Sequence, residues 1–329
     1  MAVVDIFNLQ QNVISKDLKG KFVCLYGGEK IGKSTFGSKL PRGLFCNFEM
    51  GTNFLNVKAQ PIEKWTDFKQ VVKQLEKPEA KELYDTVIID TIGRAYTLCE
   101  NYICQREGVQ KLGQVAYGAA YGDVKKEFED VLTRITLMGY GILIIAHSQK
   151  KSVDMGEFTI EKVSPNIPTR AAEIVNRLVD IIAYAHEEFD ENGNSSRWLI
   201  TRSTPTIAAG SRIKYLDPKI PFTYDDLVDA IGRAIEKEQQ LDNIEVVETS
   251  QRAELIVLDY KEIRKEAEQL WGKLLEISPE NAKIILKKAE IIFGRPIKLS
   301  EITEDQVDLY NLILIEMRDL YEECTKPLV

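Results

Sequence analysis

The chain has 329 residues, 44% hydrophobic and 29% charged, the balance of a globular protein with one large or two ordinary domains. Its formal net charge is −8, so its overall field does not attract nucleic acid, although an acidic chain can still carry a local basic groove. No apolar run reaches about eighteen residues and no basic start precedes an apolar stretch, so we expect neither a membrane span nor a signal peptide.

The first half of the chain alternates between strand-like and helix-like patterns. Short apolar runs rich in Val, Ile and Phe predict buried parallel strands at residues 22–26, 44–48, 86–90 and 141–146. Helical spacing of apolar residues lies between them, at residues 33–40, 65–75 and 123–137. Strands that alternate with helices predict an α/β fold with a parallel sheet and right-handed crossovers.

The pattern changes in the second half. Residues 178–189 and 196–203 flank the turn sequence DENGN and predict an antiparallel hairpin at one end of a mixed sheet. A helix is predicted at 224–239, followed by a weakly periodic stretch, and the remainder is helical in pattern, with a helix start at Ser278-Pro279. We therefore expect a first domain at 1–238, a linker at 239–251 and a helical C-terminal region at 252–329, which either binds a partner or DNA or only packs on the core.

The cysteines of the chain are five in number and scattered, and Cys24 and Cys46 lie inside apolar, strand-like runs. This usage is typical of buried, reduced thiols in a cytoplasmic protein. The chain has two histidines and no Cys-x-x-Cys pair, so we expect no structural zinc site.

A glycine-rich motif follows the first predicted strand and matches G-x-x-x-x-G-K-[ST]. Its residues are Gly27, Gly28, Glu29, Lys30, Ile31, Gly32, Lys33, Ser34 and Thr35. The glycines let backbone N–H groups turn inward to form an anion-binding nest with the start of the following helix. Lys33 is suited to the β- and γ-phosphates and the Ser34 hydroxyl to Mg²⁺. The motif predicts binding of ATP with Mg²⁺; the alternative, a glycine-rich turn with a solvent-exposed lysine, is disfavoured by the flanking strand and helix.

Carboxylates stand at the ends of two predicted strands. Asp90 ends the strand 86–90, where it would bind Mg²⁺ directly or through water, or would instead cap the next helix. Glu49 follows the strand 44–48 and is a candidate general base that activates the attacking water, the alternative being a surface glutamate.

Polar residues His147-Ser148-Gln149 follow the strand 141–146, at the edge where α/β sheets bind ligands. His147 or Gln149 would contact the γ-phosphate and report hydrolysis, whereas a hydrogen-bonded structural role for His147 is the alternative.

With these sites in this order, the chain resembles the RecA-like ATPase core, and is most similar to phage-encoded RecA-like ATPases associated with recombination and single-strand annealing. The resemblance covers about residues 16–224 and leaves the C-terminal helical region outside. The segments that carry it are KFVCLYGGEKIGKST, LFCNFEMGT, TVIIDTIG, VAYGAAYGDVKKEF, GILIIAHSQKK and TRSTPTIAAGSR.

The resemblance implies a site that a neighbouring subunit completes. It implies a homo-oligomer in which a basic residue reaches the neighbour's ATP; Arg212 or Lys214 fits this position, with Arg202 as a weaker candidate, and a solvated basic strand is the alternative. It further implies a phage protein in the cytoplasm of the bacterial host, with a single-strand-binding protein or another recombination protein as partner.

The resemblance also implies that single-stranded DNA is bound by loops after the strands that end at Asp90 and Ala146. Basic residues interleaved with aromatic ones suit phosphate contact and base stacking. The candidates are Arg106, Lys111, Tyr117, Tyr121, Lys150, Lys151 and Arg170. These loops are not strongly basic, which favours annealing or loading over strand exchange.

Other functions remain open at this point. A P-loop ATPase that acts as a switch or assembly factor without binding DNA is the main alternative. A small-molecule kinase is disfavoured because the stretch 150–170, where a lid would lie, contains one arginine.

Overall fold

The structure is a computed structural model that describes residues 14–154, 156, 158–242, 246–247 and 258–325. These residues fall into two compact units, one before and one after residue 256. The helix that precedes the predicted linker runs to Asp242, four residues beyond the predicted domain limit at 238, and much of the rest of the linker lies outside the described residues. The domain limits themselves stay a prediction.

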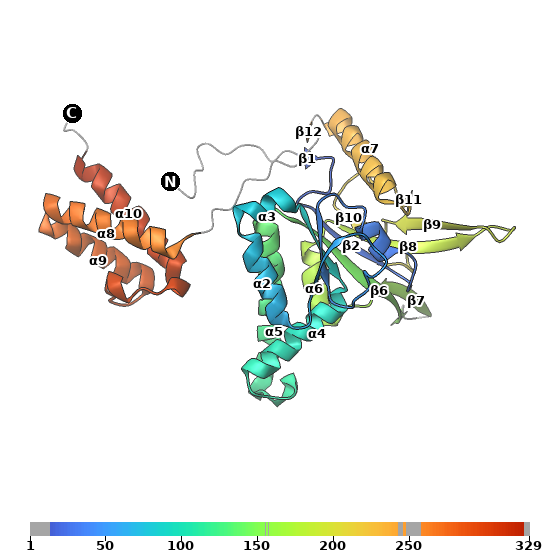
Figure 1. Ribbon diagram of the computed structural model, residues 1–329, viewed down its shortest axis with the longest axis horizontal. Helices are drawn as coiled ribbons and strands as arrows, with labels where there is room; N and C mark the ends of the chain where they lie inside the picture. The colour runs from blue at the N-terminus through green and yellow to red at the C-terminus, as the bar shows by residue number, and fades with distance from the viewer. Residues whose placement is uncertain (1–13, 155, 157, 243–245, 248–257, 326–329) are drawn as a thin grey trace. The chain divides into compact units, whose positions relative to one another are not determined.

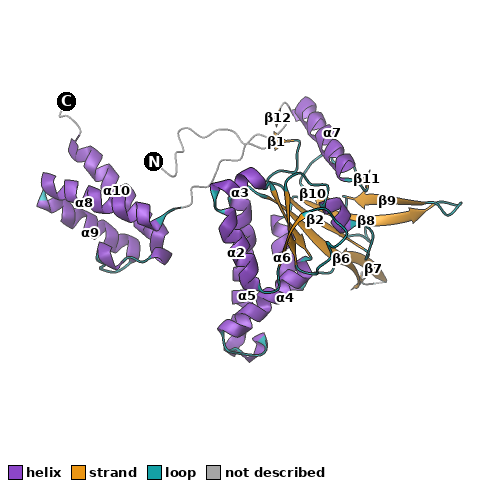
Figure 2. Ribbon diagram, in the orientation of Figure 1, coloured by secondary structure: helices purple, strands orange, loops and turns teal. Residues whose placement is uncertain are grey.

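Among the described residues of the first unit, ten strands form one mixed sheet (Figures 1 and 2) in the order β11-β9-β8-β2-β6-β5-β3-β4, with β10 paired to β8 and β7 to β6. In this order, every adjacent pair of strands from β8 to β4 is parallel. The strands β7, β9, β10 and β11 are antiparallel to their partners. The strands are β2 (Phe22–Gly27), β3 (Gly43–Asn47), β4 (Lys58–Pro61), β5 (Thr86–Asp90), β6 (Gly141–Asp154), β7 (Thr159–Pro165), β8 (Ile181–Phe189), β9 (Ser195–Ile200), β10 (Gly210–Ser211) and β11 (Lys219–Pro221). The predicted α/β fold class, with a mostly parallel sheet, is confirmed.

Helices cover both faces of this sheet (Figure 2). They are α1 (Lys33–Gly37), α2 (Trp65–Leu75), α3 (Pro78–Leu83), α4 (Ile92–Arg106), α5 (Ala119–Leu137), α6 (Thr169–Leu178) and α7 (Tyr224–Asp242). The 3₁₀ turns η1 (Leu112–Gln114) and η2 (Ala116–Gly118) lie between α4 and α5, and a separate two-stranded pair joins β1 (Ile14–Ser15) to β12 (Val246–Val247).

The alternation of side chains along the strands creates two hydrophobic cores. In β2, Cys24 and Tyr26 enter a core shared with α2, α4, α5 and α6, whereas Val23 and Leu25 enter a core shared with α1 and α7. Every residue of β2 is buried, which is why the central strands read as continuous apolar runs rather than as alternating ones.

Several elements differ from their predicted extents. The strand predicted at 141–146 continues to Asp154, because beyond the sheet it pairs with β7, which the sequence analysis did not predict. The helix predicted at 33–40 ends at Gly37, and the helix predicted at 123–137 begins earlier, at Ala119. Helix α4 was not predicted; its buried stripe includes small residues such as Ala95 and Cys99, which give weak hydrophobic contrast.

In the part of the second unit that the structure describes, three helices pack around a core of their own. They are α8 (Tyr260–Ile277), α9 (Pro279–Phe293) and α10 (Val307–Thr325), with the 3₁₀ turns η3 (Leu299–Glu301) and η4 (Glu304–Gln306) before α10. The predicted helix start is confirmed: Ser278 is the N-cap of α9, its hydroxyl accepts from the Glu280 N–H at 3.2 Å, and Pro279 is the first helical residue. None of the helices in the described residues has the length and apolar character needed to cross a membrane.

Candidate nucleotide-binding site

The phosphate loop, residues 27–35, begins at the last residue of β2. Gly27 is aligned with His147 of β6 on one side and with Ala185 of β8 on the other. A Cβ atom on Gly27 would lie 2.8 Å from the Ala185 carbonyl oxygen, so only glycine allows β8 to approach this closely. Gly32 requires glycine for another reason, because its φ of 111° lies in the left-handed region.

Lys33 is folded back over this loop. Its side chain is buried, and Nζ donates to the carbonyl oxygens of Gly27 at 3.1 Å and Gly28 at 2.6 Å. Burial lowers the pKa of Lys33, and the negative charges of Asp90, Glu29 and Glu49 oppose that shift. The lysine is therefore not the solvent-exposed residue of a plain glycine-rich turn. Its ammonium group is held at the loop by the carbonyl oxygens of Gly27 and Gly28.

Ser34 and Asp90 meet beside the loop. The Ser34 hydroxyl donates to Asp90 Oδ2 at 2.6 Å, and Asp90 is 5% exposed. Burial raises the pKa of Asp90, while the hydrogen bond from Ser34 lowers it. A hydroxyl and a carboxylate side by side are hard oxygen donors that suit Mg²⁺. In the described residues, no group of three His, Cys, Asp or Glu side chains is placed to hold a metal ion.

Glu49 follows β3, two strands from β6, and two neighbours fix its carboxylate. The Thr91 hydroxyl donates to Oε1 at 2.5 Å, and His147 Nε2 lies 3.3 Å from Oε2. Thr91 is buried and joined to Asp90 by a cis peptide bond, whereas the Glu49 side chain is 40% exposed. Glu49 is therefore a positioned carboxylate that retains access to water. Thr91 was not among the predicted site residues, although its place directly after Asp90 at a strand end was a usable signal.

The two sensor candidates lie in different surroundings. His147 contacts Glu49, and its Nδ1 is buried without a hydrogen-bond partner in the part of the chain that the structure describes. Gln149 instead donates from Nε2 to the Pro165 carbonyl at 2.7 Å, which ties the base of the β6–β7 hairpin together. The geometry therefore associates His147, rather than Gln149, with the predicted base.

The basic residues predicted to reach the ATP of a neighbouring subunit lie away from the phosphate loop of their own chain. Arg212 pairs with Asp180 at 3.0 Å, and Asp180 directly precedes β8. Because Ile181 of β8 is aligned with Val23 near the start of β2, this pair lies at the edge of the sheet opposite the phosphate loop. Lys214 pairs with Asp242 at 2.8 Å, and Arg202 is exposed.

The predicted DNA-contacting residues divide into paired and unpaired groups. Arg106 contacts Glu107 and Asp123, Lys150 contacts Glu161 at 3.1 Å, and Arg170 stacks over Tyr121 at 4.1 Å from the ring centroid. Three others are exposed and have no ion-pair or ring partner among the described residues; they are Lys111, Tyr117 and Lys151. Tyr117 also has a φ of 56°, an uncommon conformation for an aromatic residue.

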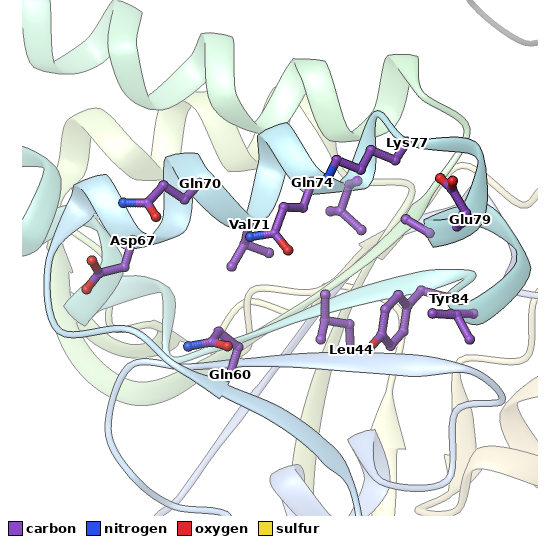
Figure 3. A pocket seen from close by; sticks show the side chains of 12 residues that line it. Leu44, Gln60, Asp67, Gln70, Val71, Gln74, Lys77, Glu79 and Tyr84 are labelled. Carbon is purple, nitrogen blue, oxygen red and sulfur yellow. The ribbon is translucent and has the colours of Figure 1, made fainter.

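A separate hollow of about 600 Å³ lies at the β4 edge of the sheet (Figure 3), between α2, α3 and the strands β3 and β4. Its lining mixes apolar residues such as Leu44 and Val71 with polar ones such as Gln70 and Gln74. None of the predicted site residues lines it, so this hollow is distinct from the phosphate loop.

A phosphate loop between the first central strand of a parallel sheet and the helix that follows is the defining feature of α/β P-loop NTPases, and the chain is of that class. It belongs to the family described as "AAA domain", whose family pattern matches residues 19–213. It is also 30% identical over 334 residues to the SPbeta prophage-derived uncharacterized protein YorG of Bacillus subtilis (strain 168), which covers 97% of this chain and 99% of that protein. The flagellar accessory protein FlaH from Methanocaldococcus jannaschii matches 62% of this chain and 85% of its own, with 14% identity and a TM-score of 0.35.

Proposed function

We propose that this AAA-family P-loop protein hydrolyses ATP with Mg²⁺ and acts on single-stranded DNA in recombination or annealing, as an oligomer. The observation that carries the proposal is the assembly, at one edge of the sheet, of Lys33, the Ser34–Asp90 pair and the Thr91–Glu49–His147 contacts. Its similarity to a prophage-derived protein supports a phage role in the host cytoplasm.

Each residue of the site has a role in this reaction. Lys33 offsets charge on the β- and γ-phosphates, and Ser34 with Asp90 provides oxygen ligands for the cation. Bound Mg²⁺ would neutralise charge on the phosphate oxygens. Glu49 orients the attacking water and accepts its proton, since its carboxylate is held by Thr91 and is partly open to solvent. His147 lies beside Glu49 and so couples the base to strand β6, where the hairpin begins.

DNA binding is supported by elements that continue past the end of β2. Strand β6 runs on for seven residues beyond His147, which is aligned with Gly27, and β7 pairs with this extension. Figure 1 shows α4 and α5 extending together past the sheet, with their connection at the tip. The residues Lys111 and Tyr117 belong to that connection and Lys151 to the hairpin, and exposed lysines and an exposed aromatic ring suit single-strand binding.

One observation favours the alternative, an ATPase switch that does not bind DNA. Three of the predicted DNA-contacting cations already have partners within the chain, namely Arg106, Lys150 and Arg170. The carboxylates beside Arg106 and Lys150 reduce the charge that attracts phosphates, and the contact with Tyr121 occupies the Arg170 side chain. The oligomer, the neighbour's cation from Arg212, Lys214 or Arg202, and a single-strand-binding protein as partner belong to the proposal and rest on the resemblance alone.

The discriminating experiment measures ATP turnover with and without single-stranded DNA at low and moderate salt. We expect DNA to raise turnover and binding to weaken with salt, because phosphate contacts release counterions. The Lys33→Ala protein sets the background. Replacing Lys111 and Lys151 by alanine should weaken DNA binding and lower the salt dependence of the DNA affinity. The control is Lys283→Ala, which removes an exposed lysine of the second unit and should change neither. DNA-independent turnover with no salt-sensitive binding would establish the switch instead.

A further inference from the structure

An arginine from β9, two strands away from β2 in the sheet, lies beside the phosphate loop of the same chain. A Cβ atom added to Gly32 would lie 3.7 Å from Nη1 of Arg197 and 3.7 Å from Cε1 of Phe222. Arg197 belongs to β9, more than 160 residues along the chain from Gly32. Arg197 was not among the predicted site residues, because the pairing of β9 with β8 and β11 brings it to this place.

The local structure holds Arg197 in a defined orientation. Its Nε donates to Glu187 Oε1 at 3.2 Å, directly across the strand pair β8–β9. Its carbonyl accepts from the Phe222 N–H at 3.0 Å, and the Phe222 ring stacks on Phe36 of α1 at 5.6 Å between centroids. The backbone of Arg197 is thus anchored to elements that pack against the helix following the loop, which lowers the entropy lost when its side chain binds a ligand.

The end of the guanidinium group is available for a ligand. In the described part of the chain, the Nη atoms of Arg197 have no hydrogen-bond acceptor, and the side chain is 51% exposed. Glu187 uses Nε only, so the two terminal nitrogens remain as a fork beside Gly32. A guanidinium fork matches the geometry of phosphate oxygens and keeps its charge at all physiological pH values.

The position of Arg197 selects the phosphates that it would contact. Backbone N–H groups of a glycine-rich phosphate loop cradle the α- and β-phosphates, whereas the loop lysine serves the β- and γ-phosphates. The Arg197 side chain lies beside Gly32 of the phosphate loop. The attacking water would instead be placed at Glu49. Arg197 is therefore positioned for the phosphates that the loop itself holds.

We infer that Arg197 binds the α- and β-phosphates of the nucleotide held by its own subunit, and that Glu187 orients it. The inference rests on the proposed nucleotide binding and adds to it a cation supplied in cis. During hydrolysis, such a cation offsets the charge that develops on the departing ADP. It differs from Arg212 and Lys214, whose side chains are engaged away from the loop.

The test compares the affinities of the Arg197→Ala and Arg197→Lys proteins for ADP and for a non-hydrolysable ATP analogue, both with Mg²⁺, by calorimetry. ADP keeps the α- and β-phosphates, so we expect Arg197→Ala to weaken both nucleotides alike, by roughly tenfold, the order of a charge-assisted hydrogen bond. Arg197→Lys should recover part of the loss. The control is Arg233→Ala, which removes an exposed arginine of α7 paired with Asp217 at 3.0 Å and should leave both affinities unchanged.

Two further measurements complete the test. Thermal unfolding without nucleotide should be the same for Arg197→Ala and the wild type, which separates binding from folding. Mixing Arg197→Ala with Lys33→Ala subunits should restore no turnover, because a cis arginine and the loop lysine must belong to the same subunit.

Unchanged ADP affinity in Arg197→Ala, with ADP binding lost in Lys33→Ala, would refute the inference and leave the proposed function standing. Weakening of the ATP analogue alone would also overturn it, since the contact would then be to the γ-phosphate. A wild-type protein that binds neither nucleotide would overturn the inference and the proposed function together.

Discussion

The hydrogen bond from Thr91 to Glu49 gives a sharp test of how the base is positioned. Thr91→Val keeps the shape of the side chain and removes the hydroxyl that donates to Oε1 at 2.5 Å. A hydrogen bond to a charged group contributes about 1.5–3 kcal/mol. The Glu49 carboxylate is 40% exposed and has a second neighbour in His147, so we take the lower figure, which corresponds to roughly a tenfold loss of kcat.

The assay is steady-state ATP turnover together with ADP affinity. We expect Thr91→Val to lower kcat and to leave ADP affinity unchanged, because Thr91 contacts the base and not the phosphate loop. Thr91→Ser keeps the hydroxyl and is the matched control. Glu49→Gln alone should lower kcat by about 10²–10⁴-fold, the range for loss of a general base.

The double variant decides whether Thr91 acts through Glu49. If it does, Thr91→Val adds little to Glu49→Gln, since residues that act as a unit are not additive. Wild-type turnover by Thr91→Val, or a full tenfold further loss in the Glu49→Gln background, would refute the reasoning.

Three other predictions follow from the packing. Gly27→Ala should lower both the thermal midpoint and nucleotide affinity because its methyl group would collide with β8, whereas Gly28→Ala, with open space around it, should be tolerated; equal behaviour of the two in a melt would contradict this. Burial raises the pKa of Cys24 to about 12, so mass spectrometry after iodoacetamide treatment at pH 8 should show the exposed Cys324 labelled and Cys24 unlabelled. Arg212→Ala should cost about 1 kcal/mol in urea denaturation through its lost contacts; a role in trans would appear as turnover recovered on mixing with subunits that lack the loop lysine.

The central strands and the phosphate loop were predictable because their signals are local. The strand 86–90 and the helix 65–75 have the predicted limits, since a buried apolar run and a clear helical stripe each specify their own element. The placing of Asp90 beside Ser34 also followed, because the ends of parallel strands meet at one edge. Where the pattern was weak, as in α4, or depended on a distant partner, as in β7, the elements were missed.

The contacts around the site were predictable only in part. Glu49 and His147 were named separately, but their contact depends on the strand order β6-β5-β3, which the sequence does not specify locally. Arg197 was beyond reach for the same reason, as it comes to the loop through β8 and β11. The pairing of Arg106 with Asp123 was likewise hidden, since it joins two helices whose connection has no strong pattern.

The extension of β6 separates the strand ends that carry the candidate site from the outer part of the β6–β7 strand pair. The strand ends that carry the site have fixed lengths, because a shift of one residue within β5 would turn Asp90 to the opposite face. Past His147, β6 is aligned with β7 and not with β2 or β5, so this outer part of the strand pair has no such limit. Substitutions on this outer part should therefore leave the phosphate loop and the Ser34–Asp90 pair intact, and it is the place at which a new binding specificity could be introduced.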